Sequence, residues 1–361
     1  MHGWPLRPGS ATLSAVRTTP RPTAPTTPLR TARSSATPVP LGASSALGVL
    51  LAAAVLLILD PAAAGALAAQ VETVAQTAMT PWKAAILGLV EGVTEYLPIS
   101  STGHLLVVSD LLGLGTTEAD IEAANTYAVA IQFGAILAVA GLFWRRFREM
   151  LLGLVGRSEP GRHLLWILVV AAVPSAAIGF LVEQPMEEVL YAPWPIVGAW
   201  FVGGLLILGL ERAGKIPRRG EARSEDRDPV LDITTRQALV IGVAQIAALW
   251  PGVSRSLSTM LGALLVGVGM VAAVEFSFLL GFVTLTGASL YKVATDGGAL
   301  VDQFGVVDPL IGLLFAFLSA VVAIKWMISY LERRSLAVFG WYRLAAAGLT
   351  AVFILAGVIE G

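Results

Sequence analysis

The sequence contains no cysteine among its 361 residues and only three histidines, His2, His104 and His163. Without cysteine, the protein cannot form disulfides, use a thiolate in catalysis or bind a metal through sulfur. Three histidines so far apart in the chain are also too few for a metal cage built from several imidazoles.

Charged residues are scarce as well. They make up 14% of the chain, whereas hydrophobic residues make up 56%. A soluble domain has about 25% charged residues. This deficit, together with long apolar runs, predicts a membrane protein. The net charge of −1 provides no global basic field, so nucleic acid is excluded as a partner.

Residues 1–44 lack acidic side chains and are rich in Ser, Thr, Pro, Arg and Ala. Such a composition cannot bury a core, so we predict a disordered leader. The apolar segment 45–70 follows, and it is either a signal-like segment or a membrane anchor. The long stretch upstream favours the anchor. A transit peptide and a misassigned start codon are further alternatives.

Ten apolar segments follow the leader: 83–98, 103–114, 125–143, 164–182, 193–210, 237–250, 256–270, 272–291, 308–329 and 338–359. A spanning helix needs about 20 residues. Four segments are shorter, and they form two pairs, broken at Pro98 and at Pro251-Gly252. Non-helical backbone at membrane depth persists only where it is buried in protein or lines a cavity. The sequence therefore predicts an all-α polytopic membrane protein with two re-entrant or broken helix hairpins.

Basic loops indicate the cytoplasmic side of such a protein. Three loops are basic, namely 144–163, 211–236 and 331–335, and three are acidic, namely 118–122, 183–188 and 296–308. With the acidic loops outside, the first hairpin starts and ends outside and the second starts and ends inside. The halves would then form an inverted-topology repeat, with 82–211 first, 212–236 as a charged cytoplasmic linker and 237–360 second.

The two halves also agree weakly in sequence. Glu91 falls opposite Gln245, and the run 100–102 falls opposite 254–256, with a slip of one residue at the prolines. In inverted repeats with interrupted helices, the functional site lies near the midplane where the breaks meet. We therefore expect the two breaks to form one site.

The first break carries carboxylates, hydroxyls and an imidazole. Glu91 and Glu95 are four residues apart and share one helix face, which suits a divalent cation with oxygen ligands or a general base. The hydroxyl run that follows can cap the next helix, whose free N–H groups also suit an anion; it comprises Ser100, Ser101 and Thr102. His104 lies one turn into that helix, where its role is either structural or catalytic.

The second break adds Arg255. Its guanidinium group is always charged, and its fork of N–H donors suits phosphate oxygens. A buried arginine requires an anionic partner, which would be Glu91, Glu95 or a ligand phosphate. Hydroxyls flank it at Ser254, Ser256 and Thr259, and each of these could instead bond only to backbone carbonyls. Glu275 is another intramembrane carboxylate, for which we expect a structural partner, with Gln132 as one candidate.

These motifs resemble the undecaprenyl-diphosphate phosphatase family, the bacitracin-resistance type of integral membrane phosphatase. The resemblance rests on EGVTEYLPISSTGH at 91–104 and PGVSRSLST at 251–259, with support from AIQFGAILAV at 130–139 and EFSFLLG at 275–281. It implies hydrolysis of a phosphoric anhydride, converting a C55 polyprenyl diphosphate to the monophosphate carrier for peptidoglycan. It also implies a multi-pass protein of the bacterial plasma membrane whose site faces outward.

The resemblance also implies roles for individual residues. Glu95, Ser101, His104 and Arg255 would be catalytic, and Glu91 with Glu95 would hold a Mg²⁺ or Ca²⁺ cofactor. The substrate-binding residues would be Ser100, Thr102, Ser254, Ser256 and Thr259. Either Ser101 attacks phosphorus or an activated water does, with His104 as base or acid.

The rival hypothesis is a transporter, either a flippase for the lipid monophosphate or an ion-coupled carrier. Inverted repeats suit transport equally well, but the local concentration of hydroxyls, histidine and arginine favours phosphate chemistry. The expected partners are the polyprenyl diphosphate and membrane lipid. The oligomeric state stays open, and a homodimer is compatible with the sequence.

Overall fold

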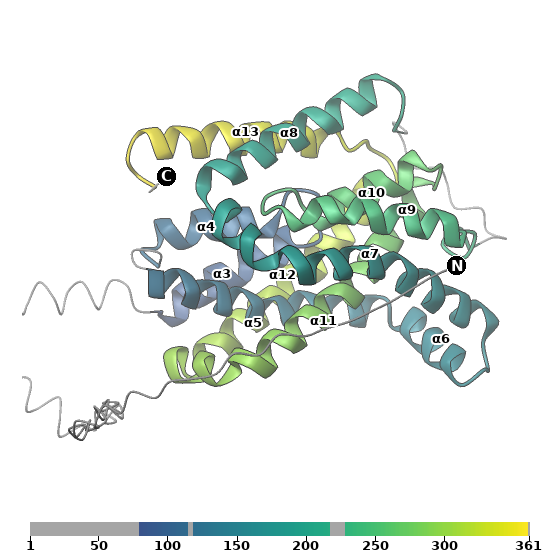
Figure 1. Cartoon of the computed structure of the whole chain (residues 1–361), viewed down its shortest axis with the longest axis horizontal. Helices are drawn as coiled ribbons and strands as arrows, with labels where there is room; N and C mark the ends of the chain where they lie inside the picture. Colours follow the sequence, from purple (N-terminus) through teal and green to yellow (C-terminus); the bar gives the residue numbers. More distant parts are fainter. Residues whose placement is uncertain (1–78, 115–117, 217–227, 360–361) are drawn as a thin grey trace, which may run out of the picture. The chain divides into compact units, whose positions relative to one another are not determined.

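The computed structural model describes residues 79–114, 118–216 and 228–359, and every regular element within them is helical. The predicted leader and the apolar segment 45–70 lie outside these residues. Figure 1 shows the helices, which are α3 (Pro81–Thr94), α4 (Ser101–Leu111), α5 (Glu118–Leu142), α6 (Trp144–Leu154), α7 (Glu159–Leu190), α8 (Pro193–Arg212), α9 (Thr235–Gln245), the 3₁₀ turn η1 (Ile246–Leu249), α10 (Arg255–Leu265), α11 (Met270–Phe304), α12 (Val307–Leu331) and α13 (Ala337–Leu355).

Six of the described helices are long and apolar enough to cross a membrane: α5, α7, α8, α11, α12 and α13. The prediction of an all-α polytopic membrane protein is thereby confirmed. In α11, 67% of the apolar span is buried inside the protein, against 22–39% in the other five. The long helix α11 is therefore the inner helix of the bundle, and the others present more of their surface outward.

The two predicted hairpins are interrupted where the prolines indicated. The first pair breaks between the end of α3 at Thr94 and the start of α4 at Ser101. The second breaks between the end of η1 at Leu249 and the start of α10 at Arg255. Each pair is thus a broken helix hairpin, whereas its re-entry into the membrane stays a prediction.

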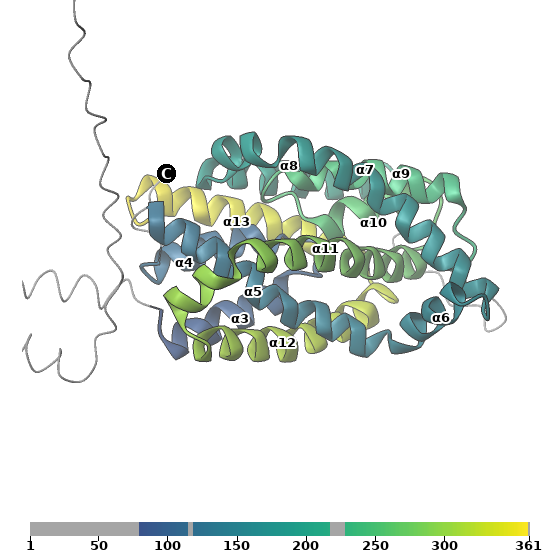
Figure 2. The ribbon, with the colours of Figure 1, turned by 60° about the horizontal axis from the view of Figure 1, so that its bottom comes forward.

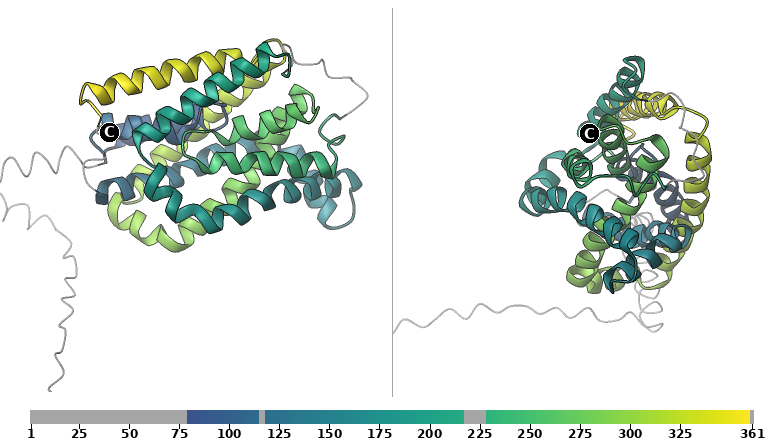
Figure 3. Two further views of the ribbon diagram at one scale, coloured as in Figure 1. Left: turned by 45° about the horizontal axis from the view of Figure 1, so that its top comes forward. Right: turned by 90° about the vertical axis from the view of Figure 1, so that its right-hand side faces the viewer.

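Segments far apart in the sequence lie side by side in this bundle. Helix α12 runs along α3 and α5, as Figure 2 shows for α3. Figure 3 shows α13 alongside α8, so the last helix of the chain lies beside the helix that ends the first half. The second hairpin packs against α7 through α9. Residues from both halves can therefore converge on the two breaks.

Glycines permit the close approach of α3 to α12. A Cβ atom on Gly88 would lie 2.1 Å from the carbonyl oxygen of Gly312, and one on Gly92 would lie 2.1 Å from that of Ala316. The two glycines are four residues apart on one face, the spacing that lets helices pack backbone to backbone in membranes. This contact holds α3, and with it Glu91 and Glu95, against the rest of the bundle.

We expect Gly92→Ala to destabilise the protein, because the added methyl group would overlap Ala316 on α12. Overpacking of this kind typically lowers the free energy of unfolding by about 1–3 kcal/mol. Thermal unfolding in detergent, followed by tryptophan fluorescence, measures the effect. Gly141→Ala is the matched control, since a methyl group added there would meet no atom within 4 Å. Equal melting temperatures for the two variants would contradict the packing argument.

Helix α6 differs from the prediction that 144–163 is a basic loop. Residues Trp144–Leu154 instead form a helix whose inner face carries Arg146, Met150 and Gly153. These positions recur every three or four residues, as on one face of a helix. The outer face carries Trp144, Leu151 and Leu154, all exposed. The arginines obscured this amphipathic period.

Candidate active site

The structure brings the two helix breaks into direct contact. The hydroxyl of Ser256 donates a hydrogen bond of 2.9 Å to the carbonyl of Leu97, and Arg255 Nη2 lies 3.5 Å from Glu95 Oε1. The hydroxyl of Ser254 also points at the carbonyl of Leu97, at 3.4 Å. The second hairpin therefore supplies side-chain donors to the backbone of the first.

Both breaks end on a serine in a strained backbone conformation. Ser100 has φ 73° and Ser254 has φ 77°, and they are the only non-glycine residues with positive φ in the described part of the chain. Such a conformation costs about 1–3 kcal/mol and clusters at functional sites. The weak internal repeat had placed these two serines opposite each other. Each immediately precedes the first residue of a helix, α4 or α10.

The two serine side chains differ in their hydrogen bonds to the helix that follows. The hydroxyl of Ser254 accepts a hydrogen bond from the backbone N–H of Leu257 and so caps α10. Ser100 makes no such side-chain bond to α4, contrary to the capping that the hydroxyl run predicted. The first N–H groups of α4 therefore have no side-chain cap and keep their capacity to bind an anion.

Glu95 is the centre of the contacts at this junction. The hydroxyl of Ser101 donates a hydrogen bond to Glu95 Oε2, while Arg255 faces Oε1. The carboxylate side chain is only 5% exposed, against 28% for Arg255. Of the partners expected for Arg255, Glu95 is thus the one that it contacts. Arg255 Nη1 also lies 3.4 Å from the hydroxyl of Thr284, and a guanidinium has five donors, so capacity remains for further oxygen acceptors.

A polar pocket opens beside this pair. Its lining comes from both breaks and consists of Glu95, Ser100, Ser101, Thr102, Ala248, Trp250, Pro251, Gly252, Ser254 and Arg255. Six of these ten were singled out from the sequence. A carboxylate, hydroxyls and a guanidinium around one pocket can neutralise an anion and move a proton.

Four of the residues singled out from the sequence are not part of this lining. The hydroxyl of Ser256 joins the two breaks, and that of Thr259 bonds to Ser277 at 2.5 Å and to the carbonyl of Arg255 at 2.9 Å. Both hydroxyls are therefore used within the protein. Glu91 and His104 also lie outside the lining.

Glu91 lies deeper in the bundle than Glu95. It is 1% exposed, and its Oε1 atom has no hydrogen-bond partner. Gln132 on α5 hydrogen-bonds to the Glu91 side chain and accepts a 3.3 Å hydrogen bond from Ser289 on α11. One carboxylate oxygen thus stays free next to the pocket. The described residues contain no group of three His, Asp or Glu side chains placed to hold a metal ion.

Both ring nitrogens of His104 are occupied. Nδ1 lies 2.6 Å from the carbonyl oxygen of Ser100, and Nε2 lies 2.7 Å from the hydroxyl of Tyr342 on α13. The imidazole also packs against the rings of Trp200 and Tyr342, with centroids 4.7 Å and 5.6 Å away. The hydroxyl of Ser101 bonds to Glu95 and not to His104.

Arg343, also on α13, was not predicted from the sequence. It is fully buried, and its Nη2 atom donates hydrogen bonds to the carbonyls of Ala199 at 2.8 Å and Gly252 at 2.9 Å. Its Nη1 atom lies 3.3 Å from the carbonyl of Pro98. One guanidinium thus fastens both breaks to α8. An arginine within an apolar segment is a functional signal, and we overlooked it because 338–359 has the length and composition of an ordinary span.

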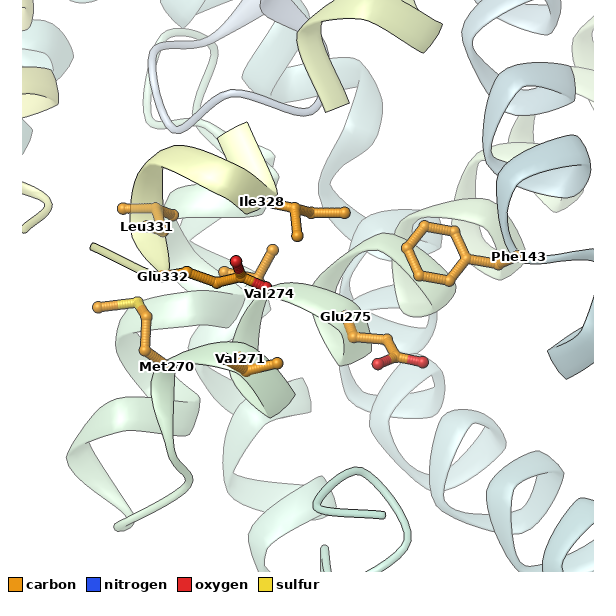
Figure 4. Close-up of a pocket in the computed structure, with 8 residues that line it drawn as sticks. All are labelled: Phe143, Met270, Val271, Val274, Glu275, Ile328, Leu331 and Glu332. Atoms are coloured by element: carbon orange, nitrogen blue, oxygen red, sulfur yellow. The ribbon is translucent and has the colours of Figure 1, made fainter. Parts of the chain in front are cut away.

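A second cavity lies at the start of α11 and the end of α12, away from the polar pocket. Figure 4 shows its lining, which is apolar except for two carboxylates and comprises Phe143, Met270, Val271, Val274, Glu275, Ile328, Leu331 and Glu332. Arg146 on α6 donates to Glu275 Oε1 at 2.7 Å, so the structural partner of Glu275 is Arg146; Gln132 belongs instead to the Glu91 cluster.

Arg146 binds Asp228 as well, through both terminal nitrogens. Burial alone would lower the pKa of the Arg146 guanidinium, but the hydrogen bonds and charges of Asp228 and Glu275 outweigh burial and raise this pKa. The arginine therefore stays charged and ties α6 to α11 and to the linker that carries Asp228. This ion-pair cluster stabilises the fold.

Comparison with known proteins bears on the chemistry of the pocket. Residues 84–349 match the family described as bacitracin resistance protein BacA. An undecaprenyl-diphosphatase of Sorangium cellulosum is 40% identical over 268 residues, which cover 74% of this chain and 84% of that protein. Similar proteins from Burkholderia lata, named undecaprenyl-diphosphatase 1, and from Burkholderia mallei, named undecaprenyl-diphosphatase, are 41% and 42% identical over 265 residues, covering 73% of this chain and 91% of each relative.

Proposed function

The chain belongs to the bacitracin resistance protein BacA family, and on that premise we propose that its polar pocket is where it hydrolyses undecaprenyl diphosphate to undecaprenyl phosphate and inorganic phosphate. The observation that carries the assignment to this pocket is the hydrogen bond from Ser101 to Glu95, with Arg255 on the other carboxylate oxygen. This arrangement brings together a nucleophile, Ser101, a base, Glu95, and an anion-binding group, Arg255.

The terminal phosphate binds between Arg255 and the start of α4. The guanidinium directs its free donors at phosphate oxygens, and the uncapped N–H groups of α4 add partial positive charge. Ser100 and Thr102 line the same pocket and offer hydroxyl donors. The lipid tail leaves the pocket sideways between apolar helices.

Ser101 is the nucleophile and Glu95 is its base. Glu95 Oε2 takes the hydroxyl proton of Ser101 as Oγ forms a bond to the terminal phosphorus, and the bond from this phosphorus to the bridging oxygen breaks. Undecaprenyl phosphate leaves with the bonding electrons. Glu95 gives this proton to the departing phosphate oxygen and is a carboxylate again. Water then attacks the phosphorus of the phosphoserine and gives a proton to Glu95. The bond from phosphorus to Ser101 Oγ breaks, and Oγ takes the proton from Glu95 as inorganic phosphate leaves. His104, whose ring nitrogens are both engaged, orients the turn before Ser101 and is not the base.

The residues present fit a divalent cation. Glu91 offers a buried carboxylate oxygen without a partner, and Glu95 lies one turn away on the same helix. Mg²⁺ is typically held by one or two carboxylates together with substrate phosphates, so a group of three acidic ligands is not required. When bound, the cation would neutralise charge on the diphosphate.

The protein is a multi-pass membrane protein. We further propose that it lies in the bacterial plasma membrane with the pocket facing outward. The positions of the basic loops support this orientation. Since one chain supplies every group of the proposed mechanism, the activity does not require the homodimer that the sequence allows. No contact in the described residues favours the transporter alternative.

Phosphate release from undecaprenyl diphosphate by the purified protein in detergent tests the proposal, because transport has no meaning in micelles. We expect Arg255→Lys to lower kcat/KM about 10- to 100-fold, because lysine keeps the charge but loses the fork. Arg148→Lys, an exposed change on α6, should leave the rate unchanged. Absence of phosphate release by the parent protein would overturn the proposed function. An Arg255→Lys variant with the parent rate would show that the mechanism does not need the bidentate guanidinium.

A further inference from the structure

His104 has a defined tautomer in this structure. A backbone carbonyl can only accept a hydrogen bond, so the 2.6 Å contact from Nδ1 to the Ser100 carbonyl places a proton on Nδ1. In the neutral ring, Nε2 then carries the lone pair, and the hydroxyl of Tyr342 donates to it at 2.7 Å. The Ser100 carbonyl thus sets the tautomer, and the Tyr342 hydroxyl, by donating to Nε2, holds the ring in the orientation in which Nδ1 meets that carbonyl.

Tyr342 is well fixed for this task. Its ring is nearly parallel to the imidazole, at an interplanar angle of 18°. The next residue, Arg343, binds backbone carbonyls at both breaks and so fixes the position of α13 along its axis relative to them. Trp200 on α8 packs on His104 as well, with ring planes 50° apart. The imidazole therefore contacts two aromatic rings, one of which also holds it by a hydrogen bond.

The contact chain ends next to the proposed nucleophile. Tyr342 holds His104, His104 holds the carbonyl of Ser100, and Ser100 adopts the strained conformation with φ 73° directly before Ser101. Strain of this kind persists only where surrounding contacts enforce it. No side-chain cap bond from Ser100 fixes this turn from within.

We propose that Tyr342 is a positioning residue for the phosphatase reaction, which holds His104 in the Nδ1–H tautomer and thereby fixes the turn that presents Ser101 to Glu95. The inference rests on the proposed function of this pocket. Tyr342 itself need not touch the substrate. Its loss should slow the chemical step and leave binding by Arg255 intact.

The kinetic test is Tyr342→Phe, which removes one oxygen atom and keeps the stacked ring. We expect kcat to fall about 10- to 100-fold with KM within about twofold, because a small misplacement of a reacting group costs about that much. Tyr330→Phe on α12, whose ring stacks on Trp326, is the matched control and should retain the parent kcat. In the background His104→Gln, Tyr342→Phe should have no further effect, since it would act only through His104.

A spectroscopic test does not depend on turnover. The chain has three histidines, so the pair of changes His2→Ala and His163→Gln leaves His104 alone in a ¹⁵N NMR spectrum. We expect the Nδ1–H form in this background. After Tyr342→Phe we expect an admixture of the Nε2–H form, because a ring that is no longer held at Nε2 can turn away from the Ser100 carbonyl. An unchanged tautomer together with an unchanged kcat would overturn the proposal.

The two tests also separate this inference from the proposed function. If Ser101 variants keep full activity while Tyr342→Phe still changes the His104 tautomer, the proposed nucleophile is wrong but the Tyr342 contact holds. If Tyr342→Phe and His104→Gln lower kcat by factors that simply multiply in the double variant, Tyr342 does not act through His104, and the positioning role is overturned.

Discussion

Replacing Arg343 with methionine is expected to cause a severe loss of stability and to lower turnover about 10²-fold. The side chain is fully buried and donates to the carbonyls of Pro98, Ala199 and Gly252. Each buried carbonyl left without a donor costs about 1–3 kcal/mol. The carbonyl of Ala199 lies inside α8 and keeps its intrahelical donor, so the carbonyls of Pro98 and Gly252 decide the loss. We therefore expect the free energy of unfolding to fall by about 2–6 kcal/mol, more than after Gly92→Ala.

The loss of turnover has a separate cause. Pro98 and Gly252 belong to different breaks, so Arg343 sets the distance between the hairpin that carries Glu95 and the one that carries Arg255. Without this clamp, a shift of about 1 Å would lower the rate about 10²-fold even in molecules that remain folded. Arg343→Lys should be intermediate, because one ammonium group cannot reach three carbonyls in the fork geometry of arginine.

Thermal unfolding in detergent and phosphate release, measured on the same preparations, test this prediction. Arg333→Met is the control, because Arg333 is exposed in the turn between α12 and α13 and its loss should change neither quantity. A stable and active Arg343→Met variant would show that the two breaks hold together without the guanidinium. A folded but inactive variant would assign the effect to alignment of the hairpins.

The sequence predicted those parts of the site that are polar within apolar surroundings. Glu95, Ser101 and Arg255 stand out because charge and hydroxyl groups are costly in a bilayer, and Pro98 and Pro251 mark the breaks that bring them together. The inverted relation of the halves also led to the expectation that the breaks meet. These signals are local, so they can be read without knowing which helices pack together.

The contacts that hold the site together were not predictable in this way. Tyr342 lies 238 residues from His104 in the sequence, and only the packing of α13 against α8 brings the two together. Periodicity cannot reveal such pairings, because they depend on which helices become neighbours. The same holds for the roles of Ser256 and Thr259, whose hydroxyls looked like substrate ligands in the sequence but bond to Leu97 and Ser277 in the structure.

The two arginines near the breaks are accommodated in different ways. Arg255 faces the carboxylate of Glu95, whereas Arg343 donates to the backbone carbonyls of Pro98, Ala199 and Gly252. A diphosphate would add negative charge near Arg255, and a cation on Glu91 would offset part of that charge.

Ser101→Ala is expected to produce the largest loss of rate, lowering kcat by at least about 10⁴-fold, because the alanine side chain cannot form a bond to phosphorus. Glu95→Gln should lower kcat about 10²- to 10⁴-fold, the range expected for loss of a general base. Phosphate release in detergent measures both rates. Ser109→Ala, on the same helix α4 but outside the pocket lining, is the control and should match the parent.

The double variant decides whether the two residues act as one unit. If Glu95 serves only to activate Ser101, then Ser101→Ala combined with Glu95→Gln should be no slower than Ser101→Ala alone. A phosphoserine at position 101, detected by mass spectrometry after acid quenching of the parent enzyme, would be the direct sign of the covalent route. If Ser101→Ala instead turned over at nearly the parent rate while Glu95→Gln stayed slow, the attacking group would be a water molecule activated by Glu95, and the hydrogen bond between Ser101 and Glu95 would mark the place where that water binds.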